Sequence, residues 1–318
     1  MDASAGSIGS LLDDACGGQR SSLARLLSVV ERGGPSAREL ERLVHPLGGA
    51  AAVVGITGSP GSGKSTLTNV LCAIARANDE RIGVLAVDPS SPFTGGAILG
   101  DRVRMSDHTL DPGIFIRSMA TRGHLGGLAL ATPAAIRVLD AVGFPWIVVE
   151  TVGVGQVEVE IVGSADTTVV VLNPGWGDAV QANKAGLMEI ADVFVINKAD
   201  RPGAGDTERD VQQMLMMRAD DGWSPPVVST VASEGTGVDE LWQAIRAHGA
   251  WLETTGAGES RRHRRVAVEL RSIVAAIAVS SAELASAGGQ FDELCKAVVE
   301  RRIDPWSAAD QLLADGDA

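Results

Sequence analysis

The sequence contains no tyrosine, and aromatic residues make up only 3% of its 318 positions. Its three cysteines, Cys16, Cys72 and Cys295, stand far apart and form no C-x-x-C pair. That spacing argues against a disulfide framework and against a zinc site, and it predicts reduced, mostly buried thiols. Hydrophobic residues still make up 45% of the chain, which is enough for a sizeable core.

The chain also lacks a long apolar run and any excess of positive charge. No apolar stretch reaches the roughly 18 residues of a membrane-spanning helix, and no basic segment is followed by an apolar one as in a signal peptide. The formal net charge is −13 and the pI is about 4.8. An acidic surface argues against nucleic acid or a membrane as the main partner, so we expect a soluble, cytoplasmic protein.

The strongest signal in the chain is a glycine-rich segment that fits G-x-x-x-x-G-K-[ST], the pattern of loops that hold nucleotide phosphates. The segment reads Gly58-Ser59-Pro60-Gly61-Ser62-Gly63-Lys64-Ser65-Thr66. The apolar run 51–57 before it predicts a buried strand, and the segment 67–77 after it predicts a helix. The motif requires this strand–loop–helix setting. A glycine-rich turn that matched the pattern by chance would not explain why a strand and a helix flank it.

In this interpretation the whole loop 58–66 binds the nucleotide. Its glycines let backbone N–H groups face a phosphate without a Cβ clash, and the helix N-terminus adds the positive end of its dipole. Lys64 supplies a charge for the β- and γ-phosphates and is a catalytic candidate, while the Ser65 hydroxyl is placed to bind Mg²⁺.

A second motif indicates which base is bound. Asn197-Lys198-Ala199-Asp200 follows the apolar run 193–196 and fits N-K-x-D, at the strand end where α/β folds bind ligands. The Asp200 carboxylate can accept hydrogen bonds from N1–H and the exocyclic amine of guanine, a pair of donors that adenine lacks. We therefore predict GTP. Val231-Ala232 lies where GTPases usually place a Ser-Ala contact to guanine, so only the backbone role of Ala232 carries over.

Between the two motifs, Glu150 ends a strand and Gly153 follows it. Most regulatory GTPases have D-x-x-G here. Glu150 is our candidate for this acid, in catalysis and in binding Mg²⁺, and Gly153 can donate its N–H to the γ-phosphate. Val154 stands where Ras-like enzymes carry the glutamine that positions the attacking water. Because valine cannot do this, we expect slow hydrolysis that needs help from elsewhere.

Two further acids and two loops complete the predicted site. Asp88 ends the second core strand and Asp101 lies in the long loop 89–107, so each can reach the Mg²⁺ or its waters; the alternative for either is a turn cap. The length and glycine content of that loop suggest a switch segment. A second such segment, 173–184, begins at another strand end and contains Lys184.

The order of the elements predicts an α/β fold, a mainly parallel, doubly wound P-loop NTPase sheet with helices on both faces. We divide the chain into an N-terminal helical extension (1–48), a GTPase domain (49–250) and a C-terminal helical extension (251–318). Predicted strands are 52–57, 82–88, 113–117, 146–150, 167–172, 192–197 and 226–230. Predicted core helices are 64–77, 126–142, 181–190, 205–218 and 237–248.

The flanking extensions have their own patterns. Leu23, Leu26, Leu27 and Val30 fit one N-terminal helix face, and Leu40, Leu43 and Leu47 fit another that begins near Ser36. Residues 253–260 have the composition of a linker, before helices at 261–282, 289–302 and 306–314. We interpret the arginines of the cluster 261–265 as a solvated helix face rather than a phosphate or partner site.

Together the motifs resemble the MeaB/ArgK family of P-loop GTPases, over about residues 36–250. The patterns that carry the resemblance are the phosphate loop 57–66, Val87-Asp88-Pro89-Ser90-Ser91, Gly95-Gly96 with Gly100-Asp101-Arg102, Glu150-Thr151-Val152-Gly153-Val154-Gly155-Gln156 and Asn197-Lys198-Ala199-Asp200. The second and fourth of these are not general GTPase patterns, which makes the resemblance specific.

The resemblance implies a chaperone that guards cofactor loading into an adenosylcobalamin-dependent acyl-CoA mutase, chiefly methylmalonyl-CoA mutase, and protects or rescues it. It also implies a homodimer formed through the C-terminal extension. Asp88 and Asp101 match the acids of switch I and Glu150 that of switch II. Gln181 and Lys184 match third-switch positions tied to stimulation by the mutase, but Ala179 replaces that switch's usual acid. We expect no directly bound cobalamin, because the chain has no D-x-H-x-x-G pattern.

Other functions stay open at this point. A metal-insertion GTPase would usually carry a histidine-rich tract or clustered cysteines, whereas the five histidines here are dispersed. A kinase or ATPase associated with amino-acid transport would prefer ATP, which Asp200 argues against. A signalling GTPase unrelated to cobalamin is excluded only by a binding test.

Overall fold

A computed structural model describes residues 5–88, 111–120, 127–151, 163–175, 190–218, 222–285 and 289–315. Asp101, Gly153, Val154, Lys184 and most of the helix expected over 181–190 lie outside these ranges. The chain forms two compact units, Met1–Arg265 and Val266–Ala318, and each is described by itself. The division into three domains, with boundaries near residues 48 and 250, stays a prediction.

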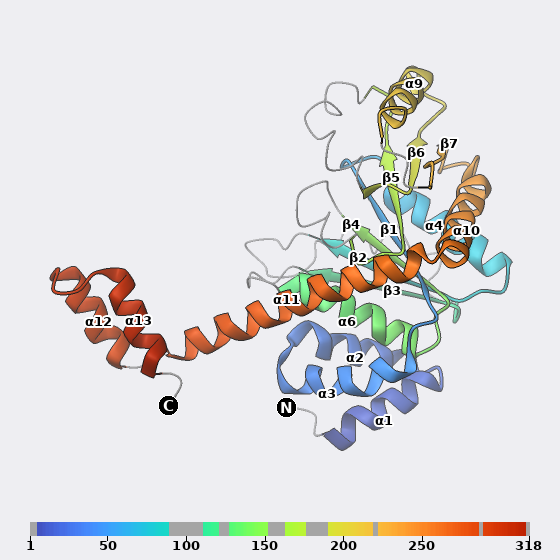
Figure 1. Ribbon diagram of the computed structural model, residues 1–318. Helices are drawn as coiled ribbons and strands as arrows, with labels where there is room; N and C mark the ends of the chain where they lie inside the picture. The colour runs from blue at the N-terminus through green and yellow to red at the C-terminus, as the bar shows by residue number, and fades with distance from the viewer. Residues whose placement is uncertain are drawn as a thin grey trace. The chain divides into compact units, whose positions relative to one another are not determined.

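The core of the first unit is a seven-stranded sheet in which every pair of neighbouring strands is parallel, in the order β3-β2-β4-β1-β5-β6-β7 (Figure 1). The predicted parallel α/β sheet is thus confirmed. Short apolar runs such as β5, buried along its whole length, suit strands that are covered on both faces. The strands are β1 (Ala52–Gly58), β2 (Ile82–Asp88), β3 (Ile114–Ala120), β4 (Trp146–Thr151), β5 (Thr167–Leu172), β6 (Val193–Asn197) and β7 (Val227–Thr230).

Helices cover both faces of this sheet. On one face α1 (Ala5–Cys16), α2 (Arg20–Arg32), α3 (Gly34–Val44) and α6 (Gly127–Ala141) share a buried apolar cluster with alternate residues of β1 to β4. On the other face α4 (Lys64–Ala77) and α10 (Val238–Thr255) pack on the intervening residues of the strands. Helix α9 (Ala204–Leu215) lies on the first face, where Val211 packs with Val170, Leu172 and Phe194 of β5 and β6. The sheet is therefore doubly wound, as predicted.

The N-terminal helices differ from expectation at one position. Leu40 is fully buried in α3, but α3 ends at Val44 and Leu47 is 56% exposed in the short 3₁₀ turn η1 (His45–Leu47). The prediction that Leu47 continues the buried face of this helix is wrong. Pro46 is the physical reason, since it lacks an N–H and cannot continue an α-helical hydrogen-bond ladder.

The expected linker at 253–260 is also wrong. Helix α10 runs to Thr255, whose hydroxyl donates to the Trp251 carbonyl oxygen across 2.7 Å, and α11 (Ala257–Ala285) begins two residues later. The sole break is Gly256, with φ of 73°. A glycine in this left-handed conformation can end one helix and redirect the chain without a longer linker. The remaining helices are α12 (Gly289–Val299) and α13 (Pro305–Asp315).

The cysteines and the helices answer two further expectations. All three thiols are free, as expected, but only Cys72 is buried, whereas Cys16 and Cys295 are exposed. The expectation of mostly buried thiols is therefore wrong for two of three, because both lie on helix positions that face away from the core.

Across the described ranges, no helix combines the length and apolar character that a membrane span needs.

Candidate nucleotide site

The phosphate loop lies at the carboxyl edge of the sheet, between the end of β1 and the first turn of α4. β1 is the central strand, with β4 on one side and β5 on the other. The next strand in sequence, β2, lies beyond β4, so the order of strands reverses beside β1. Ligands in open α/β sheets bind at the carboxyl edge beside such a reversal, and the sequence motif lies at this place.

Two positions of the loop admit only glycine. Gly58 has φ of 144°, and a Cβ there would lie 2.1 Å from the carbonyl oxygen of Val171 on β5. Gly63 has φ of 93°, and a Cβ there would lie 2.2 Å from Nδ2 of Asn197. Gly61 has φ of 73° but open space around it. Close packing against β5 and β6 therefore fixes the course of the loop.

The polar groups of the loop point inward. Lys64 is 6% exposed, and its ammonium donates to the carbonyl oxygens of Gly58 and Ser59 across 2.8 and 3.1 Å. The hydroxyls of Ser59 and Ser62 are buried without a hydrogen-bond partner among the described residues. Buried hydroxyls normally have partners. A buried cation and two hydroxyls with free hydrogen-bonding capacity suit the oxygen atoms of a phosphate chain.

The first turn of α4 is joined to the end of β4 through Glu150. This carboxylate is 2% exposed, and it accepts hydrogen bonds from the hydroxyl of Ser65 across 2.5 Å and from that of Thr68 across 2.9 Å. The pair Ser65 and Glu150 supplies the hard oxygen ligands that Mg²⁺ prefers, beside the phosphate loop. Burial, and then the negative charge of Glu150, raise the pKa of the nearby Cys72 thiol to about 12.

The guanine motif is hydrogen-bonded to the phosphate loop. Asn197 ends β6, and its amide donates to the carbonyl oxygen of Ser62 across 2.7 Å. Its Oδ1 accepts from the Thr230 hydroxyl and from the Ala232 N–H, each across 3.1 Å. One side chain thus connects three loops. The role of Asn197 in base binding stays a prediction, and its role as a brace is a structural observation.

The next residues of the motif reach outward from the same edge. Lys198 has φ of 60°, and its ammonium donates to the Gly61 carbonyl oxygen across 2.6 Å. Asp200 is exposed, and Ala232 is 4% exposed with its N–H held by Asn197. Val231 turns its backbone N–H to Thr236 across 3.0 Å instead. This arrangement leaves the Asp200 carboxylate free to meet a base edge at the surface.

Sequence analysis missed Thr68 and the pair of Thr57 and Thr151, whose hydroxyls lie 3.2 Å apart between β1 and β4. Thr68 carries a usable signal, because it is a buried polar residue on the apolar face of α4, one turn beyond Lys64. No comparable signal marks the threonine pair, since threonine is common in strands.

Of the predicted Mg²⁺ candidates, only Ser65 and Glu150 have described side chains; Asp88 ends β2 at the same edge.

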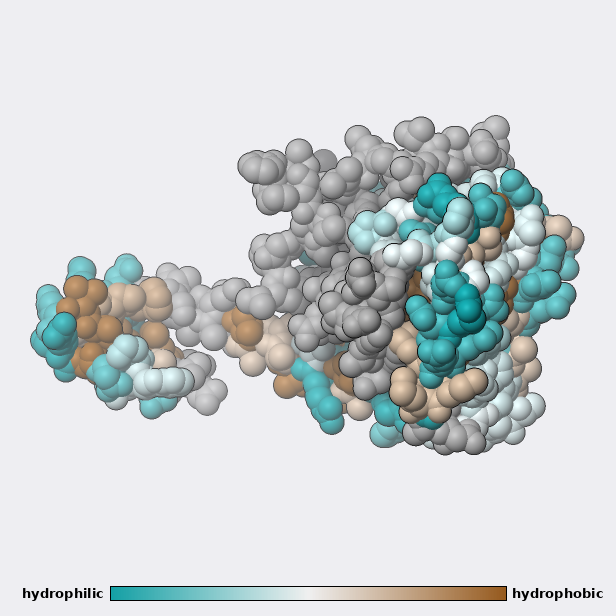
Figure 2. All heavy atoms as spheres, turned by 90° about the horizontal axis from the view of Figure 1, so that it is seen from above, coloured by the Kyte–Doolittle hydropathy of each residue, from teal (hydrophilic) through white to brown (hydrophobic). Residues whose placement is uncertain are grey.

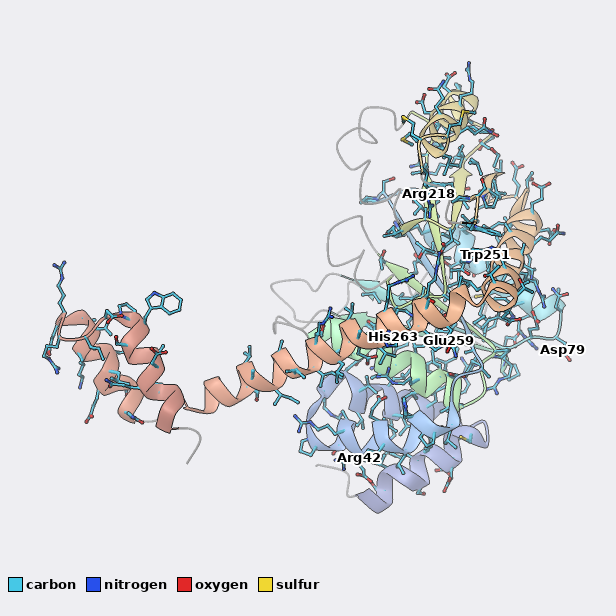
Figure 3. All side chains as sticks on the ribbon, in the orientation of Figure 1. Arg42, Asp79, Arg218, Trp251, Glu259 and His263 are labelled. Carbon is cyan, nitrogen blue, oxygen red and sulfur yellow. The ribbon has the colours of Figure 1, made fainter. Side chains whose placement is uncertain are left out.

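The arginine cluster has a structural role that the sequence interpretation did not assign. Arg261 forms a bidentate pair with the buried Asp192, at 2.8 and 2.9 Å, and Arg265 binds Asp166 across 2.6 Å. The interpretation as a wholly solvated face is wrong for these two arginines, because each pairs with an aspartate that directly precedes a strand, Asp192 before β6 and Asp166 before β5. His263, labelled in Figure 3, lies on α11 between them and is exposed.

The chain is similar to a known protein family and to several GTPases over most of its length. The sequence profile of the family described as "Methylmalonyl Co-A mutase-associated GTPase MeaB" matches residues 23–286. A Pyrococcus abyssi protein described as a GTPase is 52% identical over 302 residues, covering 94% of this chain and 93% of that protein. The GTPase ArgK of Escherichia coli is 36% identical over 267 residues, covering 80% of each.

Two more comparisons extend over most of the chain. The mouse protein named "Methylmalonic aciduria type A homolog, mitochondrial" is 31% identical over 323 residues, covering 93% of this chain and 76% of that protein. A solved structure titled "Crystal structure of LAO/AO transport system kinase" superposes with a TM-score of 0.72 at 25% identity, covering both chains completely.

Within the described ranges, no three His, Cys, Asp or Glu side chains gather as a metal site would require.

Proposed function

Because the chain belongs to the MeaB family of methylmalonyl-CoA mutase-associated GTPases, we propose that its GTPase works as a chaperone for an adenosylcobalamin-dependent acyl-CoA mutase. In this proposal it gates cofactor loading into methylmalonyl-CoA mutase, and protects or reactivates that enzyme, in the cytoplasm. GTP hydrolysis follows from the family and the fold, whereas the mutase partnership is the part that needs a test. The hydrogen bond from Asn197 to Ser62 carries the nucleotide assignment, since it joins the guanine and phosphate motifs in one site.

The proposal assigns a role to each residue of the predicted nucleotide site. Residues 58–66 surround the phosphate chain, with Lys64 moving its ammonium from loop carbonyl oxygens to phosphate oxygens. Asp200 meets the guanine edge, and the backbone of Ala232 completes the base contact. Gly153 contributes a backbone N–H to the γ-phosphate. A carboxylate at Asp200 makes guanine the preferred base, so GTP should be hydrolysed and ATP should not, which separates this proposal from a transport kinase.

The oxygen atoms of Ser65 and Glu150 are of the chemical kind that Mg²⁺ prefers as ligands. Ser65 and Glu150 would hold the ion or its waters, with Asp88 and Asp101 as the other acids of the proposed set. When bound, Mg²⁺ would neutralise charge on the phosphate oxygens and orient them. Glu150 itself is fixed by two hydroxyl donors on α4, so its carboxylate cannot turn away from the phosphate loop without losing both hydrogen bonds.

We further propose that hydrolysis is slow alone and is stimulated by the mutase. Val154 has no group that can position an attacking water, and Lys184 belongs to the segment through which the partner would act. The test mixes the purified chain with purified methylmalonyl-CoA mutase and follows phosphate release. The expected result is a rate well below one per second for the chain alone and at least about ten times higher with the mutase, corresponding to a barrier lowered by about 1.4 kcal/mol.

Two outcomes of this test bear on different parts of the proposal. Hydrolysis of GTP without association with the mutase in either nucleotide state would sink the chaperone role and leave the GTPase intact. Hydrolysis of ATP as readily as GTP would overturn the base assignment. Lys184→Ala should keep GTP binding and lose the stimulation. Lys296→Ala, at another of the four lysines of the chain, is the matched control.

We also propose a homodimer formed through the C-terminal extension. Exposed apolar residues on α11 recur at helical spacing, at positions 266, 270, 273, 274 and 277, with exposures of 37 to 59%. Figure 2 shows further apolar residues, in brown, on the surface of α12 and α13. A stripe of this kind favours a partner helix. Leu270→Glu should shift the mass in solution to that of a monomer, and the exposed Arg271→Glu should not.

A further inference from the structure

A cavity with a volume of about 480 Å³ opens at the amino edge of the sheet, the edge opposite the phosphate loop. It lies where β2, β3 and β4 begin, and the turn between α1 and α2 closes one side. Its lining combines three arginines, Arg20, Arg76 and Arg81, with an apolar floor that includes Phe115 and Phe144. The volume is within the range of small-molecule sites.

The arginines of this cavity are not equally neutralised. Arg76 is paired with Asp111, whose carboxylate accepts from Nε across 3.0 Å, and with the exposed Asp79, which also lines the cavity, at 3.9 Å. Arg20 instead donates to two backbone carbonyl oxygens, those of Asp111 and Ile114, each across 2.7 Å. Arg81 donates to the carbonyl oxygens of Val142 and Gly143 across 3.3 and 3.4 Å. Among the described residues, neither Arg20 nor Arg81 has a carboxylate within ion-pair distance.

Aromatic rings hold these two guanidinium groups in place. Arg81 lies over the ring of Phe144, 4.2 Å from its centroid, and Arg20 lies over that of Phe115 at 5.7 Å. The two rings pack against each other with centroids 6.3 Å apart. Partial burial, and then the positive charge of Arg76, lower the pKa of Arg81. Two guanidinium groups without a carboxylate partner among the described residues, Arg20 and Arg81, therefore meet at the mouth of the cavity, in a chain whose net charge is −13.

We propose that this cavity binds a small organic dianion, with its charge between Arg20 and Arg81 and its apolar body on Phe115 and Phe144. Two guanidinium groups without a carboxylate partner match two negative charges, because a guanidinium binds carboxylate or phosphate oxygens through paired N–H groups. The apolar floor would gain from covering a hydrocarbon portion of the ligand. The site is separate from the phosphate loop and does not depend on the mutase proposal.

Cys16 provides a reporter at the rim of the cavity. Its thiol is exposed and lines the opening, with Sγ 3.8 Å from the Ala141 carbonyl oxygen. The test uses the full chain saturated with GDP and Mg²⁺, so that the phosphate loop is occupied. Phenyl phosphate and phenylsuccinate are the probes. Phenol, which lacks the negative charge, and inorganic phosphate, which lacks the apolar body, are the controls. Binding is measured by calorimetry, and Cys16 alkylation by peptide mass spectrometry, with Cys295 as internal reference.

The expected result is that at least one aromatic dianion binds, and that it slows alkylation of Cys16 but not of Cys295. Phenol should not bind, and inorganic phosphate should bind at least about tenfold more weakly. Binding of phenyl phosphate alone would identify a phosphate site, and binding of phenylsuccinate alone a dicarboxylate site. Failure of both to bind or to protect Cys16 would overturn the proposal.

Variants keep the test specific. Arg20→Met and Arg81→Met retain an apolar stem on the phenylalanine rings and remove the charge, so each should weaken dianion binding at least about tenfold. Arg25→Met, at an exposed arginine on the same helix α2 and outside the cavity, should bind as the wild type does. Retained GDP-dependent thermal stabilisation shows that each variant is folded. Equal binding by all three variants would contradict the assignment.

Discussion

The side-chain amide of Asn197 donates a hydrogen bond to the carbonyl oxygen of Ser62 across 2.7 Å. The donor belongs to the motif that we propose selects guanine, and the acceptor to the loop that we propose surrounds the phosphates. Because the same side chain also accepts from Thr230 and from the Ala232 N–H, base and phosphate binding share one support. Changes at this residue should therefore alter both.

Asn197→Asp replaces the donor by an oxygen that repels the Ser62 carbonyl oxygen. The loss of a buried hydrogen bond costs about 1 to 3 kcal/mol, so GTP affinity should fall by about tenfold or more and the melting temperature should fall as well. Calorimetric titration with GTP measures the first and thermal unfolding the second. Asp200→Asn is the control, since Asp200 is exposed: it should weaken GTP binding at unchanged stability. Wild-type affinity in Asn197→Asp would refute the shared support.

Gly63→Ala should abolish nucleotide binding. The new Cβ would lie 2.2 Å from Nδ2 of Asn197, which is too close for any Cβ, so the loop or the asparagine must move. Gly61→Ala is the matched control, because Gly61 also has a positive φ but has nothing within 4 Å of a new Cβ. It should cost only the strain of the left-handed backbone, about 1 to 2 kcal/mol. Equal loss of GTP binding in the two variants would argue against steric contact as the cause.

Thr68→Val tests how Glu150 is positioned. The Thr68 hydroxyl donates a hydrogen bond to Oε2 of Glu150 across 2.9 Å. Valine has the shape of threonine but cannot donate this hydrogen bond. The apparent Mg²⁺ concentration for half-maximal hydrolysis should rise about fivefold, the equivalent of one hydrogen bond of about 1 kcal/mol. Thr254→Val, at an exposed position of α10 outside the phosphate loop, should leave it unchanged. The idea fails if Thr68→Val needs no more Mg²⁺ than the wild type.

Alkaline pH should destabilise the chain through Cys72. Its pKa in the folded state is raised to about 12 by burial and by Glu150, above the ordinary value of 9.0, so the folded chain keeps a proton that the unfolded chain loses. The stabilisation is complete below pH 9 and is lost as the pH rises toward 12, by up to about 4 kcal/mol. Urea unfolding between pH 8 and pH 11 measures it, and no tyrosine titrates in this window. Cys72→Ala should show a shallower decline.

Asp192→Asn should destabilise the first unit strongly. The carboxylate is 3% exposed at the side chain, and it is bound by Arg261 and by the Thr168 N–H across 2.9 Å. Removing one charge of a buried pair costs about 3 to 5 kcal/mol, and because the Arg261 side chain is 24% exposed the expected loss lies toward the lower end of that range. Asp206→Asn, which removes an exposed pair with Arg209, should change the free energy of unfolding by less than 1 kcal/mol. Similar effects in chemical denaturation would contradict this account.

The sequence was most informative where structure depends on neighbouring residues. The apolar run of β5 and the strand–loop–helix setting of residues 58–66 depend on local patterns, and both are confirmed. The linker prediction failed because composition alone does not show that Gly256 suffices to separate two helices. The apolar spacing that includes Leu47 extends beyond the end of α3, because Pro46 stops the helix before this residue.

Contacts between distant residues were beyond the reach of such patterns. Asn197 and Ser62 are 135 positions apart, and nothing in N-K-x-D states that its asparagine braces the phosphate loop. The local pattern around Arg261 predicts a solvated residue, because its partner Asp192 stands 69 positions earlier in the sequence. Periodicity indicates which face of an element is buried, but it does not identify which charged residue lies across from it.

The place of β1 between β4 and β5 has a consequence for the synthesis of the protein. The phosphate loop leaves the ribosome early, but the strands that flank it are completed only at Thr151 and Leu172, and its brace Asn197 comes later still. Chains are made from the N-terminus at about 5 to 20 residues per second. A nascent chain therefore carries an unsupported loop for several seconds, and it acquires the capacity to hold nucleotide only after most of the sheet has been translated.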